Sequence, residues 1–192
     1  MNRIHITLCL LLFALTANAQ TESHLQFKGI PIDGNYKAFV QKLVQKGFTI
    51  EDSSEEVILL KGTFMARPKT VVVVYADPTS KVVSMVAAML EAGSNWPDIE
   101  TDYFNTVDTY KEKYGVPSNH EEVFTTRLIS DDDYWRLNAL KEGNCNYQTK
   151  WITDCGEIKV KLAFFYFKYY VCCIYKDEEN AKALHQTVMD DI

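Results

Sequence analysis

Histidine is the side chain most often used for proton transfer near neutral pH, and beyond residue 19 the sequence contains His24, His120 and His185. His120 is followed by two glutamates, but the second histidine of a His-Glu-x-x-His zinc site is missing. The sequence also lacks the Gly-x-Ser-x-Gly elbow of serine hydrolases and the glycine-rich loops that hold nucleotide phosphates. These motifs therefore give no positive indication of an enzyme, and we expect no metal site and no cofactor.

Cysteines are the second group that could do chemistry, and beyond residue 19 the sequence has Cys145, Cys155, Cys172 and Cys173. Their spacings do not match the Cys-x2-Cys pairs of zinc ribbons, and two adjacent residues of a strand point to opposite faces. In an exported chain an even number of cysteines predicts disulfides, with three pairings open. Free buried thiols are the alternative.

Three consecutive acids, Asp131 to Asp133, raise the question of a calcium site. They lack the Asp-x-Asp-x-Asp-Gly spacing of an EF-hand loop, and carboxylates are favoured in the first turn of a helix. We therefore interpret the run as the start of a helix with Ser130 as its N-cap. A hydrolase that uses two facing carboxylates leaves no local motif, so that class of enzyme stays open.

The segment Phe164–Tyr170 is the strongest candidate for a binding surface, because six of its seven residues are aromatic. In a strand about half of these rings must point away from the core, and exposed aromatic clusters mark partner or ligand sites. The candidate contact residues are Phe165, Tyr166, Phe167, Tyr169 and Tyr170. The alternative is that both sheet faces are covered and the rings belong to the core.

The first nineteen residues predict a secretory signal peptide. Arg3 precedes an apolar run over residues 6–15, and an Ala-Asn-Ala motif then ends at Ala19. We expect cleavage between Ala19 and Gln20. The run is shorter than the roughly 20 apolar residues of a membrane span, and Cys9 lies inside it rather than after it, which argues against a lipid anchor. The sequence thus predicts a secreted or periplasmic protein with no membrane span in the mature chain.

Composition predicts a compact protein that does not bind nucleic acid. Of the 192 residues, 47% are hydrophobic and 12% aromatic, which is ample for a packed core. The net charge is −6 at pH 7 and becomes more negative once Arg3 is removed. The basic footprint of nucleic-acid-binding proteins is therefore missing.

Hydrophobic periodicity predicts the same order of elements twice, a helix followed by three strands. The first set comprises a helix at 36–46 and strands at 57–64, 70–76 and 81–90. The second set comprises a helix at 98–114 and strands at 147–153, 157–165 and 168–175, with an inserted helix at 131–142 and a last helix at 177–189. We predict an α+β fold of two tandem α-βββ modules, 20–93 and 94–192, with antiparallel meander sheets and the helices on one face. The strands form either one continuous sheet or two sheets side by side.

The strand at 157–165 shows which of its faces is buried. One face carries Ile158, Val160, Leu162 and Phe164, and the other carries Lys159, Lys161 and Ala163. This alternation predicts one buried and one wetter face. If the next strand pairs across a short turn, Cys173 joins the apolar face and Cys172 lies near the lysines.

This layout resembles the beta-lactamase-inhibitor-protein-like group and the related outer-membrane assembly lipoproteins of the SmpA/OmlA type. Secreted bacterial proteins with tandem helix-plus-three-strand modules are similar in two short motifs, Phe27-x-Gly29-Ile30-Pro31-Ile32-Asp33-Gly34 and Phe39-x3-Leu43-x3-Gly47-Phe48. The lipidation cysteine of the assembly lipoproteins is missing. The resemblance implies a non-catalytic binding module that works through an exposed sheet face.

The sequence therefore predicts an exported binding protein that contacts a protein or a glycan through its outer sheet face and the Phe164–Tyr170 aromatics. A secreted hydrolase with a carboxylate or cysteine site is the first alternative. An accessory protein of the cell envelope is the second.

Overall fold

The computed structural model of the protein describes residues 23–54, 56–126 and 132–190. The predicted signal peptide and its cleavage site, together with Ser130 and Asp131, lie outside the described residues. The first half contains β1 (Gln26–Phe27), β2 (Ile30–Pro31), α1 (Tyr36–Gln45), β3 (Thr49–Ser53), β4 (Val57–Phe64), β5 (Arg67–Ala76) and β6 (Val83–Glu91). The second half contains α2 (Trp96–Tyr114), β7 (Asn119–Phe124), α3 (Asp133–Lys141), β8 (Cys145–Thr153), β9 (Gly156–Phe165), β10 (Lys168–Asp177) and α4 (Glu178–Asp190).

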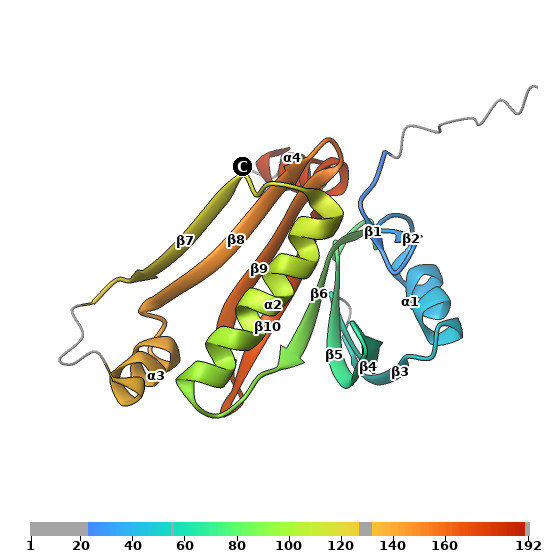
Figure 1. The fold of residues 1–192 in the computed structure, drawn as a ribbon. Helices are drawn as coiled ribbons and strands as arrows, with labels where there is room; N and C mark the ends of the chain where they lie inside the picture. The colour runs from blue at the N-terminus through green and yellow to red at the C-terminus, as the bar shows by residue number, and fades with distance from the viewer. Residues whose placement is uncertain (1–22, 55, 127–131, 191–192) are drawn as a thin grey trace, which may run out of the picture.

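The predicted α+β class is confirmed, and eight of the described strands form one antiparallel sheet (Figure 1). Its order is β3-β4-β5-β6-β10-β9-β8-β7, while β1 and β2 form a separate hairpin. The two meanders join where β6 pairs with β10, with Ala88 opposite Cys173. Each half therefore contributes four strands to a continuous sheet, and the division into two α-βββ modules stays a prediction.

Helix starts follow local capping chemistry. The side chain of Asn35 accepts a hydrogen bond from the amide of Lys37, and that of Asn95 accepts one from the amide of Asp98. The cap of α3 is Asp132, whose carboxylate accepts from the Trp135 amide at 3.2 Å. The prediction of Ser130 as this N-cap was therefore wrong by two residues, whereas the interpretation of the acidic run as the start of a helix is confirmed for Asp132 and Asp133.

One face of the sheet is covered by α1, α2 and α3. The alternating apolar residues of β9 and β10 pack there against Tyr103, Val107 and Tyr110 of α2. The Tyr110 and Tyr175 hydroxyls lie 2.5 Å apart, and the indole N–H of Trp151 donates to the Gly115 carbonyl at 3.0 Å. The main core therefore lies between these helices and one side of the sheet.

The helix α4 departs from the expectation that all helices pack on one face. Figure 1 places α2 in front of the sheet and α4 behind it. Ala181 and Lys182 of α4 border a pocket together with Glu157 and Lys176, which belong to the opposite sheet face. The reason is topological, because α4 follows β10 directly at Glu178 and turns over the end of the sheet that α2 leaves uncovered.

Candidate functional site

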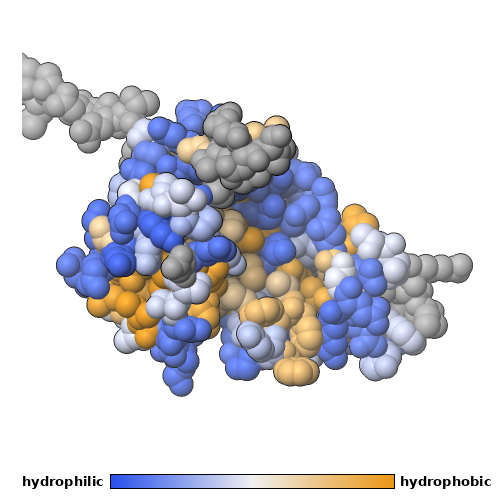
Figure 2. Space-filling view, turned by 180° about the vertical axis from the view of Figure 1, so that it is seen from behind, coloured by the Kyte–Doolittle hydropathy of each residue, from blue (hydrophilic) through white to orange (hydrophobic). Residues whose placement is uncertain are grey.

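The helix α4 packs against β6, β9 and β10 on the second face of the sheet, and we call the rest of this face the open sheet face. Its apolar half lies on β4, β5, β6 and β10 and contains Leu59, Val71, Val73, Tyr75, Met85, Ala87, Met89, Cys172 and Ile174. Its polar half lies on β8 and β9 and contains Gln148, Lys150, Glu157, Lys159 and Lys161. Figure 2 shows apolar residues in and beside a central hollow, next to a broad hydrophilic area.

The register predicted for this face is confirmed. Cys172 lies opposite Lys161, and Tyr170 lies opposite Ala163. Antiparallel sheets normally turn a polar face to solvent, so a half-apolar open face is a candidate contact surface.

The polar half is held together by ion pairs. Glu157 accepts from Lys150 and from Lys159, with both N–O distances at 3.0 Å. Partial burial raises the pKa of Glu157, but the hydrogen bonds and charges of the two lysines outweigh it and lower the pKa below its ordinary value. The carboxylate is thus fixed in its ionised form, which is unsuited to a general acid.

The turn between β9 and β10 presents three aromatic side chains to solvent, and we call Phe165, Tyr166 and Phe167 the aromatic tip. Their exposed fractions are 53%, 78% and 92%. Phe165 pairs with Lys168, so Tyr166 and Phe167 form a two-residue turn, and their φ angles are 44° and 61°. Turns of this type favour Asn-Gly, because a side chain in the left-handed region costs about 1–2 kcal/mol.

Tyr169 and Tyr170 do not belong to this exposed tip. Each is 8% exposed. The ring of Tyr169 packs against that of Phe164 at 5.0 Å, with the Lys141 ammonium 5.9 Å from both ring centres. Tyr170 lies on the open sheet face between Glu91 and Ala163. Of the five candidate contact residues, the structure therefore brings three together at the turn and places two in the sheet.

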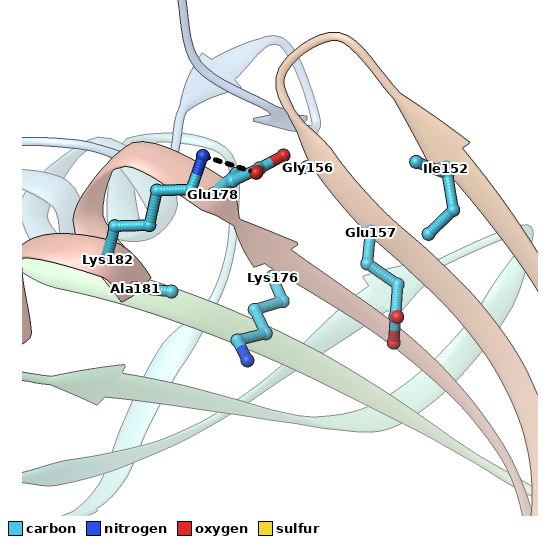
Figure 3. A pocket seen from close by; sticks show the side chains of 7 residues that line it. All are labelled: Ile152, Gly156, Glu157, Lys176, Glu178, Ala181 and Lys182. Carbon is cyan, nitrogen blue, oxygen red and sulfur yellow. Dashed lines mark ion pairs between the residues drawn. The ribbon is translucent and has the colours of Figure 1, made fainter. Parts of the chain in front are cut away.

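A pocket of about 440 Å³ lies where α4 meets the open sheet face (Figure 3). It is lined by Ile152, Gly156, Glu157, Lys176, Glu178, Ala181 and Lys182. Its ammonium and carboxylate groups are largely engaged, since Lys182 pairs with Glu178 at 2.6 Å and Glu157 pairs with the β8 and β9 lysines. No sequence pattern predicts this pocket, because its position depends on which sheet face α4 covers.

His120 belongs to a hydrogen-bonded chain that resembles a catalytic triad in its residue types. Its Nε2 contacts Glu122 Oε1 at 2.5 Å and its Nδ1 contacts Thr149 Oγ1 at 2.7 Å. Thr149 in turn contacts the Tyr103 hydroxyl at 2.7 Å. Thr149 is fully buried, so a substrate cannot reach its hydroxyl. We interpret this series of hydrogen bonds as a structural link between the edge strand β7 and α2. The side chain of His185 lies outside the described part of the protein.

His24 sits in an acidic environment at the start of the described chain. Its Nδ1 lies 3.2 Å from a carboxylate oxygen of Asp177, which is fully buried and also accepts from the Leu25 amide at 2.9 Å. Burial lowers the pKa of His24, but the hydrogen bond and charge of Asp177, with the charges of Asp33 and Glu179, raise it above its ordinary value overall. The arrangement ties the first residues to the start of α4.

No disulfide joins the four cysteines of the described chain, so the structure gives the predicted disulfides no support. Cys172 and Cys173 occupy opposite faces of β10, as predicted. Cys145 and Cys155 lie at opposite ends of β8, which at about 3.4 Å per residue is far beyond disulfide reach. Burial raises the pKa of Cys145 and Cys173 to about 12 and that of Cys172 to about 11, so these thiols are neutral and poor nucleophiles.

Among the described residues, no three His, Cys, Asp or Glu side chains form a group that could hold a metal ion. In the same part of the chain, no helix is long and apolar enough to cross a membrane. Comparison with known families, with curated proteins and with solved structures finds no match. The resemblance to the beta-lactamase-inhibitor-protein-like and SmpA/OmlA-type groups therefore stays a prediction.

Proposed function

We propose that this protein is an exported, non-catalytic binding protein that contacts a protein or glycan through the aromatic tip and the adjoining open sheet face. In this proposal it acts in the periplasm or outside the cell, after removal of residues 1–19. By strand alternation Phe165 lies on the same side of β9 as Lys161 and Ala163. The tip thus continues the open sheet face beyond the end of the sheet.

The aromatic tip carries the proposal. Tyr166 and Phe167 hold exposed side chains in a backbone conformation that favours glycine and asparagine. Neither exposure nor strain stabilises the isolated protein. Backbone strain combined with exposed apolar surface is typical of contact sites. Burial of one such ring in a partner contributes about 1.5–3 kcal/mol.

The environments of the candidate catalytic side chains support a non-catalytic role. The buried thiols have raised pKa values, the carboxylate of Glu157 is held ionised by two lysines, and the Thr149 hydroxyl is inaccessible. The apolar half of the open sheet face is partly exposed at Leu59, Val71, Tyr75, Met85, Met89 and Ile174, whereas Val73, Ala87 and Cys172 are buried.

A capture experiment tests the proposal with three baits of residues 20–192. The wild type is compared with a Tyr166→Asn/Phe167→Gly variant, which removes two rings but installs the preferred turn sequence. An Ala66→Gly variant is the control, because Ala66 occupies the equivalent position of the β4–β5 turn, with φ 59° against 61° for Phe167. Baits are presented to envelope and medium extracts of the source organism, and captured partners are purified for affinity measurement.

We expect the double variant to bind its purified partner at least about ten-fold more weakly, from about 1.4 kcal/mol or more of lost burial. The control should bind like the wild type. Equal binding by all three baits would refute the role of the tip. Failure of every bait to capture a protein or a glycan would refute the binding role and make a hydrolase substrate screen the next step.

A further inference from the structure

The sheet is split at one end between β8 and β9. Their register runs from Thr153 opposite Gly156 to Gln148 opposite Lys161 and stops there. Beyond this point, residues 145–147 of β8 remain paired with β7, and residues 162–165 of β9 remain paired with β10. Neither segment pairs with the other. The two strands therefore turn unpaired edges toward each other.

A pocket of about 410 Å³ occupies this split, within the usual size range of ligand sites. Its described lining is Thr125, Leu140, Lys141, Gly143, Cys145, Asn146, Tyr147, Lys161, Leu162, Ala163 and Phe164. In an antiparallel sheet, alternate residues of a strand direct both backbone groups toward the same neighbour. Half of residues 162–165 therefore aim their N–H and C=O groups at the pocket rather than at β10. Such groups need partners, and water or a bound chain can supply them.

The two sides of the pocket differ in chemistry. Lys161 and Asn146 lie on the side of the open sheet face, as strand alternation requires. Leu162 and Phe164 lie on the other side, where Leu140 of α3 adds apolar surface. The described lining includes no carboxylate and two lysines, one on each side. Lys161 lies on the side of the open sheet face, and the Lys141 ammonium lies on the other side, 5.9 Å from the centre of the Phe164 ring. The whole chain, by contrast, has a net charge of −6.

On the neighbouring strand β7, the carboxylate of Glu121 already accepts several hydrogen bonds. The amides of Asn119, Asn146 and Gln148 all donate to Glu121, and with the Lys150 charge they lower its pKa below the ordinary value despite an opposing desolvation effect. Glu121 is therefore ionised, and its two oxygens are occupied by these three amides.

We propose that this pocket binds an extended acidic peptide segment, which adds as a short strand to the free edge of β9. Four residues at about 3.4 Å each would follow residues 162–165. Because successive side chains of a strand alternate in direction, the segment should carry acids on the side of Lys161 and apolar side chains on the side of Leu162 and Phe164. The geometry thus favours an acid-apolar-acid-apolar pattern. The site borders the aromatic tip at Phe165 and shares Lys161 with the open sheet face, but it needs neither Tyr166 nor Phe167 and goes beyond the proposed function.

Titration of ¹⁵N-labelled protein, residues 20–192, with capped tetrapeptides tests this assignment. The probes are acetyl-Glu-Val-Glu-Val-amide, the corresponding Lys-Val-Lys-Val peptide, and the acidic peptide with N-methylated valines. We expect the acidic peptide to bind with a dissociation constant below about 1 mM and to shift the amides of residues 162–165. The basic and N-methylated peptides should bind at least about ten-fold more weakly.

A charge reversal provides the matched variant. Lys161→Glu, checked by its spectrum to be folded, should lose the acidic peptide and gain the basic one. The Tyr166→Asn/Phe167→Gly variant should bind the acidic peptide like the wild type, which distinguishes this site from a contact made by the exposed rings of Tyr166 and Phe167. Equal binding of acidic and basic peptides, undiminished binding of the N-methylated peptide, or no binding at millimolar concentration would each overturn the assignment.

Discussion

Replacing Phe167 by glycine should stabilise the protein, although it removes the ring of a phenylalanine. The side chain is 92% exposed, so its loss forfeits almost no burial in the isolated protein. The φ of 61° costs a non-glycine residue about 1–2 kcal/mol. Glycine relieves that strain, but it also makes the unfolded chain more flexible, which lowers the free energy of unfolding by about 0.4–1 kcal/mol. The net expectation is a gain of about 0.5–1 kcal/mol in the free energy of unfolding.

Urea denaturation followed by tryptophan fluorescence measures this gain. The midpoint should rise with an unchanged slope, and the melting temperature should rise by roughly 1–4 °C for a chain of this size. Ala66→Gly is the matched control, because its φ of 59° predicts a gain of similar size in the other turn. If Phe167→Gly destabilises the protein while Ala66→Gly stabilises it, the Phe167 ring contributes to folding and the exposure argument fails. If both variants destabilise, the strain argument fails.

Three further results are expected. In His24→Gln, urea titrations should show a larger loss of stability at pH 5.5 than at pH 8.5. Because the pKa of His24 is raised in the folded protein, protonated His24 stabilises the fold fully below its unfolded pKa near 6.5, and this stabilisation is lost as pH rises through the folded pKa. An equal loss at both pH values would contradict this. Gly156→Ala should lower the free energy of unfolding by at least about 2 kcal/mol, because the φ of Gly156 is 149° and an added Cβ would collide with the Lys176 carbonyl. A melting temperature equal to that of the wild type would refute the clash. The thiols of Cys172 and Cys173 should react with a thiol reagent only after unfolding, and fast labelling of the native protein would show that they are accessible.

Much of the second meander could be predicted from its sequence. Ile158, Val160 and Leu162 alternate with lysines, and a period of two fixes which side of the strand is buried. A two-residue turn then fixes the register of β10, which is why Cys172 was correctly predicted to lie on the side of the lysines. The strand β3 was missed for the opposite reason. All five of its residues are exposed, so only its backbone pairing with β4 defines it.

The candidate site was less accessible to sequence reasoning. Aromatic composition located the segment, but not the turn within it, because Tyr-Phe is not a sequence that predicts a left-handed turn. Tyr169 and Tyr170 were assigned to the exposed group, yet they follow the turn and enter the strand. The split between β8 and β9 is set by where two strands diverge, which no local pattern encodes.

The pairing of β6 with β10 at the centre of the sheet has a consequence for how the chain folds. As the polypeptide emerges, β6 is complete long before β10 exists, since Ala88 must await Cys173. During that interval an apolar strand, Val83–Glu91, presents a free edge in the middle of the future sheet. Such edges pair readily with other chains, and contacts between residues distant in sequence form slowly. Aggregation of the newly made protein should therefore compete with folding at this strand, and dilution or a chaperone that masks β6 should favour the native sheet.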